Sequence, residues 1–193
     1  MPTTRKELQV KRFSSKPTWE TWLKRYHETS AGLWLEIAKK GSHPVSVSYA
    51  EALEVALCYG WIDGQIASVD ARRYRQLFTP RRPRSKWSQI NRAAVERLIA
   101  EGRVAPAGQR AIEAAQQDGR WAAAYPSPRN MTVPDDLKAE FDANPRARSF
   151  FDQLDSQNRY GILYRLLEAK KPETRQRRLD KFVRMLQAGE TLH

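Results

Sequence analysis

The sequence predicts an α+β fold, in which a small antiparallel sheet of about three strands packs with helices and the C-terminal third is all helical. Short runs with the alternation of strands occur only before residue 81, and every segment after Pro134 has helical spacing. At 193 residues, 40% of them hydrophobic, the chain can bury a core. We expect an extended, flexible arm over 1–17, an α+β core over 18–125 and a helical subdomain over 126–193 packed on that core.

The first part of the core is predicted to contain a helix, a strand and a second helix. Aromatic and leucine side chains at i, i+3, i+4 and i+7 after Pro17 predict the first helix. The alternation in GLWLEIA, residues 32–38, predicts a strand. Ser48 and Glu51 have the spacing of a capping box and predict the start of the second helix, and Gly60 predicts its end.

A hairpin is expected after the second helix. The tetrapeptide WIDG, residues 61–64, is a turn signal. It leads into QIASVD and YRQLFTP, two runs with β-branched and aromatic residues on either side of an Asp-containing turn. These runs predict two antiparallel strands, and the basic loop PRRPRSK, residues 80–86, leaves the second of them.

Start and stop signals divide the rest of the chain into helices. One helix is expected from about Ser88 to Glu101, and another follows a break marked by Pro106 and Gly108 and is ended by Gly119. The Pro-rich segment 124–134 is expected to be a connector. Further helices are expected after Pro134, after Asn144-Pro145, after Asp155 or Ser156, and after Pro172.

The positive charge of the chain is concentrated in one stretch. The formal net charge is +12, and the window from Arg72 to Arg92 holds eight cations and no acid. A basic surface of this kind attracts phosphates, acidic lipid head groups or acidic proteins. The expected partner is therefore an anionic small molecule or an acidic protein, with nucleic acid as the alternative.

Several classes of site and location are not expected. The single cysteine, Cys58, excludes an intrachain disulfide and is expected to be a buried packing thiol. The three histidines are scattered, and no nucleotide-loop, zinc-protease or hydrolase motif occurs, so neither a metal site nor a cofactor is expected. The N-terminal residues show no apolar signal segment, and no apolar run is long enough to span a bilayer, which favours a cytoplasmic location.

The basic loop and the helix start that follows it form the candidate site. The first turn of a helix exposes backbone N–H groups, and guanidinium groups next to them favour a bound anion. Pro80 and Pro83 stiffen the loop and lower the entropy lost when its charges are held in place. The residues expected to bind the anion are Arg81, Arg82, Ser85, Lys86, Ser88, Asn91 and Arg120. The residues expected to shape the site are Trp61, Asp63, Trp87, Trp121 and Tyr125.

Each key residue also has a structural interpretation. Ser88 is explained as a helix N-cap alone, with the loop arginines in solvent. Asn91 is explained by a structural hydrogen bond, and Asp63-Gly64 by a turn. Arg120 is explained as a partner for Asp63, as part of the anion site, or as a cation at a helix end with no further role.

The chain resembles the YdeI/OmpD-associated family, also called bacteriocin-protection proteins. The resemblance rests on TWETWLKRYHE, GLWLEIAKK, SYAEALEVALCYGWIDGQ, YRQLFTPRRPRSKWSQIN, GRVAPAG and DGRWAAAY, in that order, and is taken to extend over the whole chain. It implies a bacterial protein linked to tolerance of bacteriocins, cationic peptides or envelope stress, without a defined reaction. The signature residues carried over are Gly60, Trp61, Asp63, Gly64, Pro80, Arg81, Arg82, Ser85, Trp87, Ser88, Asn91, Gly119, Arg120, Trp121 and Tyr125.

Three functions follow, in order of preference. The first is non-catalytic binding of an anionic ligand or acidic partner by the basic loop. The second is nucleic-acid binding by the same surface, with Trp87 or Tyr74 stacking on bases. The third is an enzyme with Asp63 as the base and the arginines as an oxyanion clamp. The sequence identifies no catalytic residue, and the interpretation leans away from an enzyme.

Overall fold

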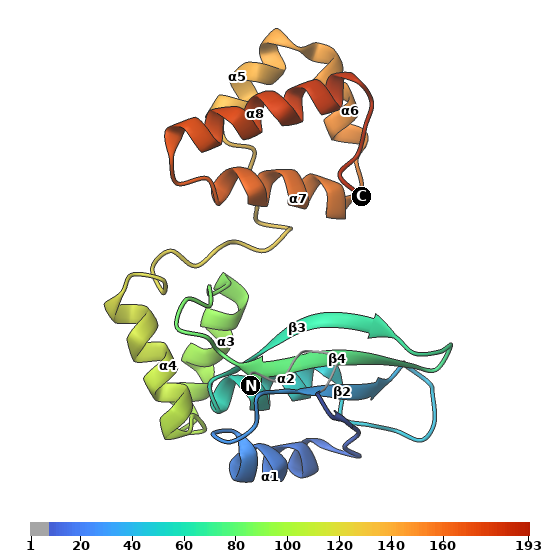
Figure 1. Ribbon diagram of the computed structural model, residues 1–193, viewed down its shortest axis with the longest axis vertical. Coiled ribbons are helices and arrows are strands. Elements are labelled where there is room, and N and C mark those ends of the chain that lie inside the picture. Colours follow the sequence, from blue (N-terminus) through green and yellow to red (C-terminus); the bar gives the residue numbers. More distant parts are fainter. Residues whose placement is uncertain (1–7) are drawn as a thin grey trace. The chain divides into compact units, whose positions relative to one another are not determined.

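The computed structural model describes residues 8–193, which divide into two compact units (Figure 1). Unit 1 ends at Tyr125 and contains the whole sheet. Unit 2, Pro126–His193, contains only helices. The α+β class predicted from the sequence is confirmed.

The sheet is mixed and has four strands in the order β1-β2-β4-β3. The strands are β1 (Val10–Lys11), β2 (Leu33–Ala38), β3 (Trp61–Ser68) and β4 (Arg73–Pro80). The β2–β4 and β3–β4 pairs are antiparallel, as predicted, whereas the short β1 runs parallel to β2. The extended arm predicted over 1–17 includes this strand and the start of the first helix, and residues 1–7 lie outside the described residues.

The segment WIDG is part of a strand, and the prediction of a turn there is wrong. β3 begins at Trp61, and its register against β4 shifts between Asp63 and Ile66. The extra residue forms an irregularity of the β-bulge kind, which re-aims side chains locally. The turn of the hairpin lies further on, where the carboxylate of Asp70 accepts hydrogen bonds from the backbone N–H groups of Arg72 and Arg73.

Helices α1 (Lys16–Tyr26) and α2 (Tyr49–Cys58) cover one face of the sheet (Figure 1). Ser48 and Glu51 form the predicted capping box at the start of α2, and Gly60 follows its end with a φ of 71°. Burying aliphatic and aromatic side chains between the helices and the sheet supplies the main stabilisation of this core. Its buried members are Trp19, Leu23, Leu33, Leu35, Ile37, Val47, Ala52, Val55, Ala56, Trp61 and Phe78.

Helices α3 (Gln89–Ala100) and α4 (Pro106–Gln117) build a second core against the end of α2. The predicted break between these helices exists, but it ends before Pro106, because Pro106 opens α4 and Gly108 lies within it. A Cβ atom at Gly108 would lie 2.2 Å from the carbonyl oxygen of Cys58, so only glycine permits this contact between α4 and α2.

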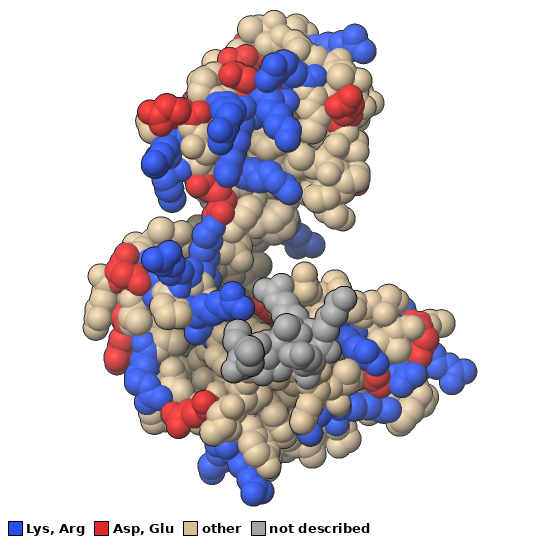
Figure 2. All heavy atoms as spheres, viewed as in Figure 1, with Lys and Arg blue, Asp and Glu red and all other residues tan. Residues whose placement is uncertain are grey.

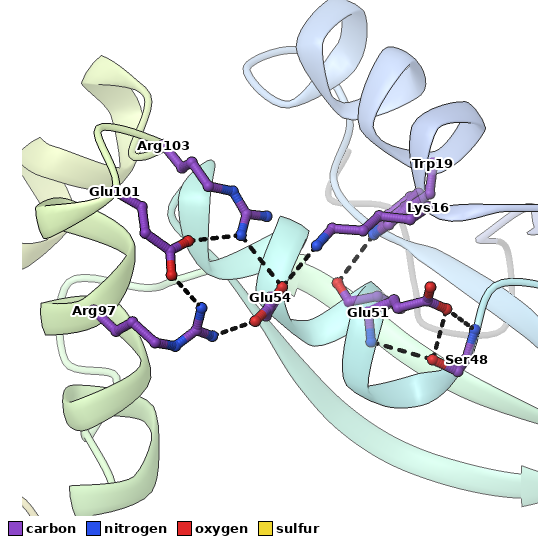
Figure 3. Close-up of polar contacts among 9 residues, drawn as sticks. Lys16, Trp19, Ser48, Glu51, Glu54, Arg97, Glu101 and Arg103 are labelled. Atoms are coloured by element: carbon purple, nitrogen blue, oxygen red, sulfur yellow. Dashed lines mark hydrogen bonds and ion pairs between the residues drawn. The ribbon is translucent and has the colours of Figure 1, made fainter.

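An ion-pair network around Glu54 ties α1, α2 and α3 together (Figure 3). The Glu54 carboxylate pairs with Lys16 at 2.7 Å, with Arg97, and with Arg103 at 3.5 Å. Arg97 and Arg103 also pair with Glu101. The hydrogen bonds from Lys16 and Arg97 lower the pKa of Glu54 to about 2, against the smaller opposing effect of burial.

Unit 2 is a bundle of four helices with its own core. The helices are α5 (Asp135–Ala143), α6 (Pro145–Gln153), α7 (Ser156–Leu167) and α8 (Pro172–Gln187), and they follow the predicted start signals. Asp155 is the N-cap of α7 and accepts from the backbone N–H of Asn158. The buried core consists of Leu137, Phe141, Ala147, Phe151, Ile162, Leu163, Leu166, Leu179, Phe182, Val183, Met185 and Leu186.

Lys and Arg side chains occur on the visible faces of both units (Figure 2). In unit 2, Arg175 of α8 pairs with Asp136 of α5, with its Nη2 2.9 Å from Oδ1. No helix among the described residues has the length and apolar character needed to cross a membrane.

The network gives a testable dependence of stability on pH. The pKa of Glu54 is lower in the folded chain than the usual 4.5, so its contribution is complete above about 4.5 and is lost as the pH falls towards about 2. We expect Glu54→Gln to lower the free energy of unfolding by about 1–3 kcal/mol at neutral pH. Urea titrations of both proteins should show this gap shrinking at about pH 3. A gap that is unchanged or larger in acid would contradict the assignment.

Candidate functional site

The basic loop is held at its start and within its turn by hydrogen bonds from backbone N–H groups. The N–H of Arg81 donates to the carbonyl oxygen of Gly60 at 2.9 Å, immediately after β4 ends. Within the loop, the N–H of Ser85 donates to the carbonyl of Arg82, and the N–H of Arg82 donates to Oγ of Ser85, each at 2.9 Å. Ser85 is therefore used in the turn of the loop.

Arg81 folds back over the indole of Trp87. Its Cζ atom lies 3.5 Å from the centroid of the Trp87 ring, and its Nη1 donates to the carbonyl oxygen of Lys86 at 3.1 Å. A guanidinium over an indole face is a cation–π contact, which is strongest away from water. Burial lowers the pKa of Arg81 to about 10, against the opposing effects of Tyr125 and Asp63, so the side chain is still a cation at neutral pH.

Three N–H donors of this stacked pair are buried and have no acceptor among the described residues. They are Nε and Nη2 of Arg81 and Nε1 of Trp87. Trp87 is only 1% exposed, and its ring meets that of Trp121 edge to face at 4.9 Å. A buried donor without an acceptor costs about 1–3 kcal/mol, so a group of three is an energetically unfavourable feature of this region that calls for an explanation.

The segment after α4 closes this region from the other side. The N–H of Tyr125 donates to the carbonyl of Trp87 at 3.0 Å, and the N–H of Gln89 donates to the carbonyl of Tyr125 at 2.9 Å. Arg120 donates from Nη1 to the carbonyl of Ser85 at 2.8 Å and from Nε to the carboxylate of Asp118 at 2.7 Å. Arg120 is thus paired with Asp118, and its hydrogen bond to Ser85 holds the loop.

Ser88 is the N-cap of α3, and its Oγ accepts from the backbone N–H of Asn91 at 3.1 Å. Asn91 is half-buried in the first turn of the helix. Burial raises the pKa of the Tyr125 hydroxyl, and Asp63 raises it further, whereas Arg81 and a hydrogen bond with Ser88 oppose the rise. These interactions place Tyr125 among Ser88, Arg81 and Asp63.

Asp63 and Trp61 have separate roles. The hydroxyl of Tyr49, the first residue of α2, donates to Oδ2 of Asp63 at 2.9 Å. Trp61 is buried in the core under the helices, where its Nε1 donates to the carbonyl of His27 at 3.1 Å. Sequence reasoning missed Tyr49, because nothing in its spacing relates it to Asp63 fourteen residues later.

The cations of the basic window are not brought together. Arg72–Arg75 lie at the opposite end of β4 from Arg81, roughly 20 Å away along the strand. Arg82, Arg84 and Lys86 are exposed. Of the predicted residues, the structure gathers Arg81, Ser85, Ser88, Arg120, Trp87, Trp121 and Tyr125 in one region, with Asp63 electrostatically coupled to it. Among residues 8–193, no group of three or more His, Cys, Asp or Glu side chains is placed to hold a metal ion.

The site lies in the part of the chain that carries the longer of two family matches. Residues 11–111 match the family described as a domain of unknown function (DUF8412). The chain belongs to this family. The match includes Asp63, Arg81 and Trp87 and ends before Arg120 and Tyr125.

The C-terminal unit of this family member has a second match. Residues 130–189 match the family described as bacteriocin-protection, YdeI or OmpD-associated. The resemblance seen in the sequence is thereby confirmed, but over part of the chain only. The motifs that suggested it all lie in unit 1, outside this match. A comparison with curated proteins and one with solved structures each found no match.

Capping by Ser88 can be tested separately from ligand binding. We expect Ser88→Ala to lower the free energy of unfolding by about 0.5–2 kcal/mol, because α3 loses the acceptor for the N–H of Asn91. Ser88→Asp should recover most of the loss, since a carboxylate also accepts from this N–H and favours a helix start. Chemical denaturation of the three proteins measures both effects. Equal stability of Ser88→Ala and the wild type would rule out capping as a stabilising contact.

Proposed function

We propose that unit 1 is a non-catalytic binding module for a small acidic ligand, with Arg81 as the principal anion-binding residue. The observation that carries the proposal is the group of three buried donors on the stacked Arg81 and Trp87, for which the described residues provide no acceptor. A phosphate or carboxylate offers several acceptor oxygens and matches the planar fork of a guanidinium.

The surroundings of Arg81 support an anion in two ways. Arg120 lies close enough to lower the pKa of Arg81 by repulsion, so the two cations share one region, and Lys86 is close enough to act on Tyr125. The guanidinium of Arg81 is held by a hydrogen bond from its Nη1 to the carbonyl of Lys86. The loop over residues 82–84 is exposed, so a modest movement of this loop would open the fork to solution.

We propose a bacterial, cytoplasmic setting in which the protein contributes to tolerance of bacteriocins, cationic peptides or envelope stress. The link to bacteriocins is supported by the description of the family matched by residues 130–189. A chain with a net charge of +12 repels cationic peptides, so direct sequestration of such peptides is disfavoured. The protein would therefore act through an acidic ligand or an acidic protein partner.

The proposal predicts that anion binding depends on Arg81 and not on loop charge in general. Inorganic phosphate and ethyl phosphate serve as probes in titration calorimetry. We expect Arg81→Gln to weaken their binding by about tenfold or more, because a bidentate charge-assisted contact is lost. Arg84→Gln is the matched control: it removes the same charge from an exposed position of the same loop and should change the affinity by no more than about twofold.

A structural role for Arg81 is separated from binding by a second variant. Arg81→Lys keeps the cation and most of the stack on Trp87 but loses the fork, so it should fold and still bind more weakly than the wild type. Circular dichroism and thermal melts confirm folding of each variant. Equal weakening by Arg81→Gln and Arg84→Gln, or no binding by the folded wild type, would overturn the proposal.

Nucleic-acid binding is the second candidate, and the exposure of Arg82, Arg84 and Lys86 favours it. If these cations neutralise phosphates, the logarithm of the affinity for mixed-sequence DNA or RNA should fall linearly with the logarithm of the salt concentration, with a slope of about −2 to −3. Fluorescence anisotropy over a salt series measures the slope, and replacing Arg82 and Arg84 by Gln should flatten it by about 2. A slope near zero would exclude this candidate.

A further inference from the structure

Asp63 is a carboxylate that a neighbouring side chain positions beside the proposed anion site. It lies where the register of β3 shifts, and the Tyr49 hydroxyl donates to its Oδ2 at 2.9 Å. Burial and the proximity of Asp63 both raise the pKa of this hydroxyl, so at neutral pH it is a proton donor. One carboxylate oxygen is therefore fixed by Tyr49.

No cation among the described residues forms an ion pair with Asp63. Arg73 pairs with Asp70 and Glu36, and Arg120 pairs with Asp118. Arg81 is close enough to interact electrostatically with Asp63, but its guanidinium stacks on Trp87. The carboxylate of Asp63 is half-buried, and its Oδ1 is not one of the buried side-chain atoms without a hydrogen-bond partner. This oxygen can therefore accept a hydrogen bond from a ligand.

Asp63 and Arg81 are separated by a distance that one small molecule can span. The backbone of Arg81 is bonded to Gly60, three residues before Asp63 on β3, so the two backbones are roughly 10 Å apart. The long side chain of Arg81 shortens the gap, and each group acts electrostatically on Tyr125. If the anionic group of a ligand binds Arg81, the ligand atoms a few bonds away from that group therefore lie close to Asp63.

We propose that Asp63 determines the specificity of this site and selects small acidic ligands that also carry a protonated amine over plain anions. The proposal rests on the anion-binding function of Arg81. Asp63 repels a ligand that has only negative charge, and it attracts an ammonium group that hydrogen-bonds to its exposed oxygen. Tyr49 is a positioning residue, because it acts by orienting the carboxylate.

A matched pair of probes tests the selection. Ethyl phosphate and 2-aminoethyl phosphate have the same anionic group and differ in one ammonium group. We expect the wild type to bind 2-aminoethyl phosphate at least about threefold more tightly, which corresponds to a modest charge–charge contact at a partly exposed site. Asp63→Asn should change the two affinities in opposite directions: the affinity for ethyl phosphate rises and the affinity for 2-aminoethyl phosphate falls.

Two further variants test whether the Asp63 carboxylate itself causes the preference for the amine. Tyr49→Phe should lower the preference for the amine in the same direction as Asp63→Asn but by less, since the carboxylate remains and only its orientation is lost. Glu113→Gln, which removes an exposed acid from α4, is the control for net charge and should leave the preference unchanged.

The outcomes separate this inference from the proposed function. Binding of ethyl phosphate that depends on Arg81, together with equal affinities for the two probes in the wild type, would overturn the selection by Asp63 and leave anion binding intact. A preference for the amine that survives Asp63→Asn would also overturn it. If neither phosphate binds the folded wild type, the anion site itself fails and the inference fails with it.

Discussion

The contact between the Arg81 guanidinium and the Trp87 indole connects the main segments around the candidate site. Arg81 is bonded through its backbone to Gly60, at the junction of α2 and β3, and Trp87 is bonded through its carbonyl to Tyr125. Trp87 also packs edge to face on Trp121 in the core formed by α3 and α4. A desolvated cation–π contact contributes about 2 kcal/mol, and this one holds β4, the loop and the start of α3 in one arrangement.

Other arginines in the chain show how this protein pairs a guanidinium whose role is structural. Arg97 and Arg103 share the carboxylates of Glu54 and Glu101, and Arg175 is held by Asp136. Arg75 and Arg159 each leave one buried Nε without an acceptor, but Arg81 leaves two N–H groups, and the adjacent Trp87 adds a third. Burying a cation without a counter-ion is unfavourable, and this cost is the observation on which the proposed anion site rests.

The helices and the hairpin followed from local signals in the sequence, whereas the site did not. Proline and cap residues marked the helices of unit 2 because those signals act within one turn. β1 was missed because a strand of two residues is too short to show an alternating pattern. Asp63-Gly64 was taken for a turn because the same dipeptide suits both a turn and a β-bulge. The loop was correctly placed after β4, but Arg81, Arg82 and Arg84 are equivalent in sequence. Only the tertiary position of Trp87 decides that Arg81 turns inward and the other two face solvent.

The two family matches lie on either side of the boundary between the two units. Each match therefore supports statements about its own unit. The bacteriocin-protection description belongs to residues 130–189, which have a core of their own, whereas Arg81, Trp87 and Asp63 lie in residues 11–111. The ligand chemistry of unit 1 must therefore be argued from the contacts of Arg81 and Asp63. The description of the C-terminal family applies to residues 130–189, and it says nothing of the anion site proposed in unit 1.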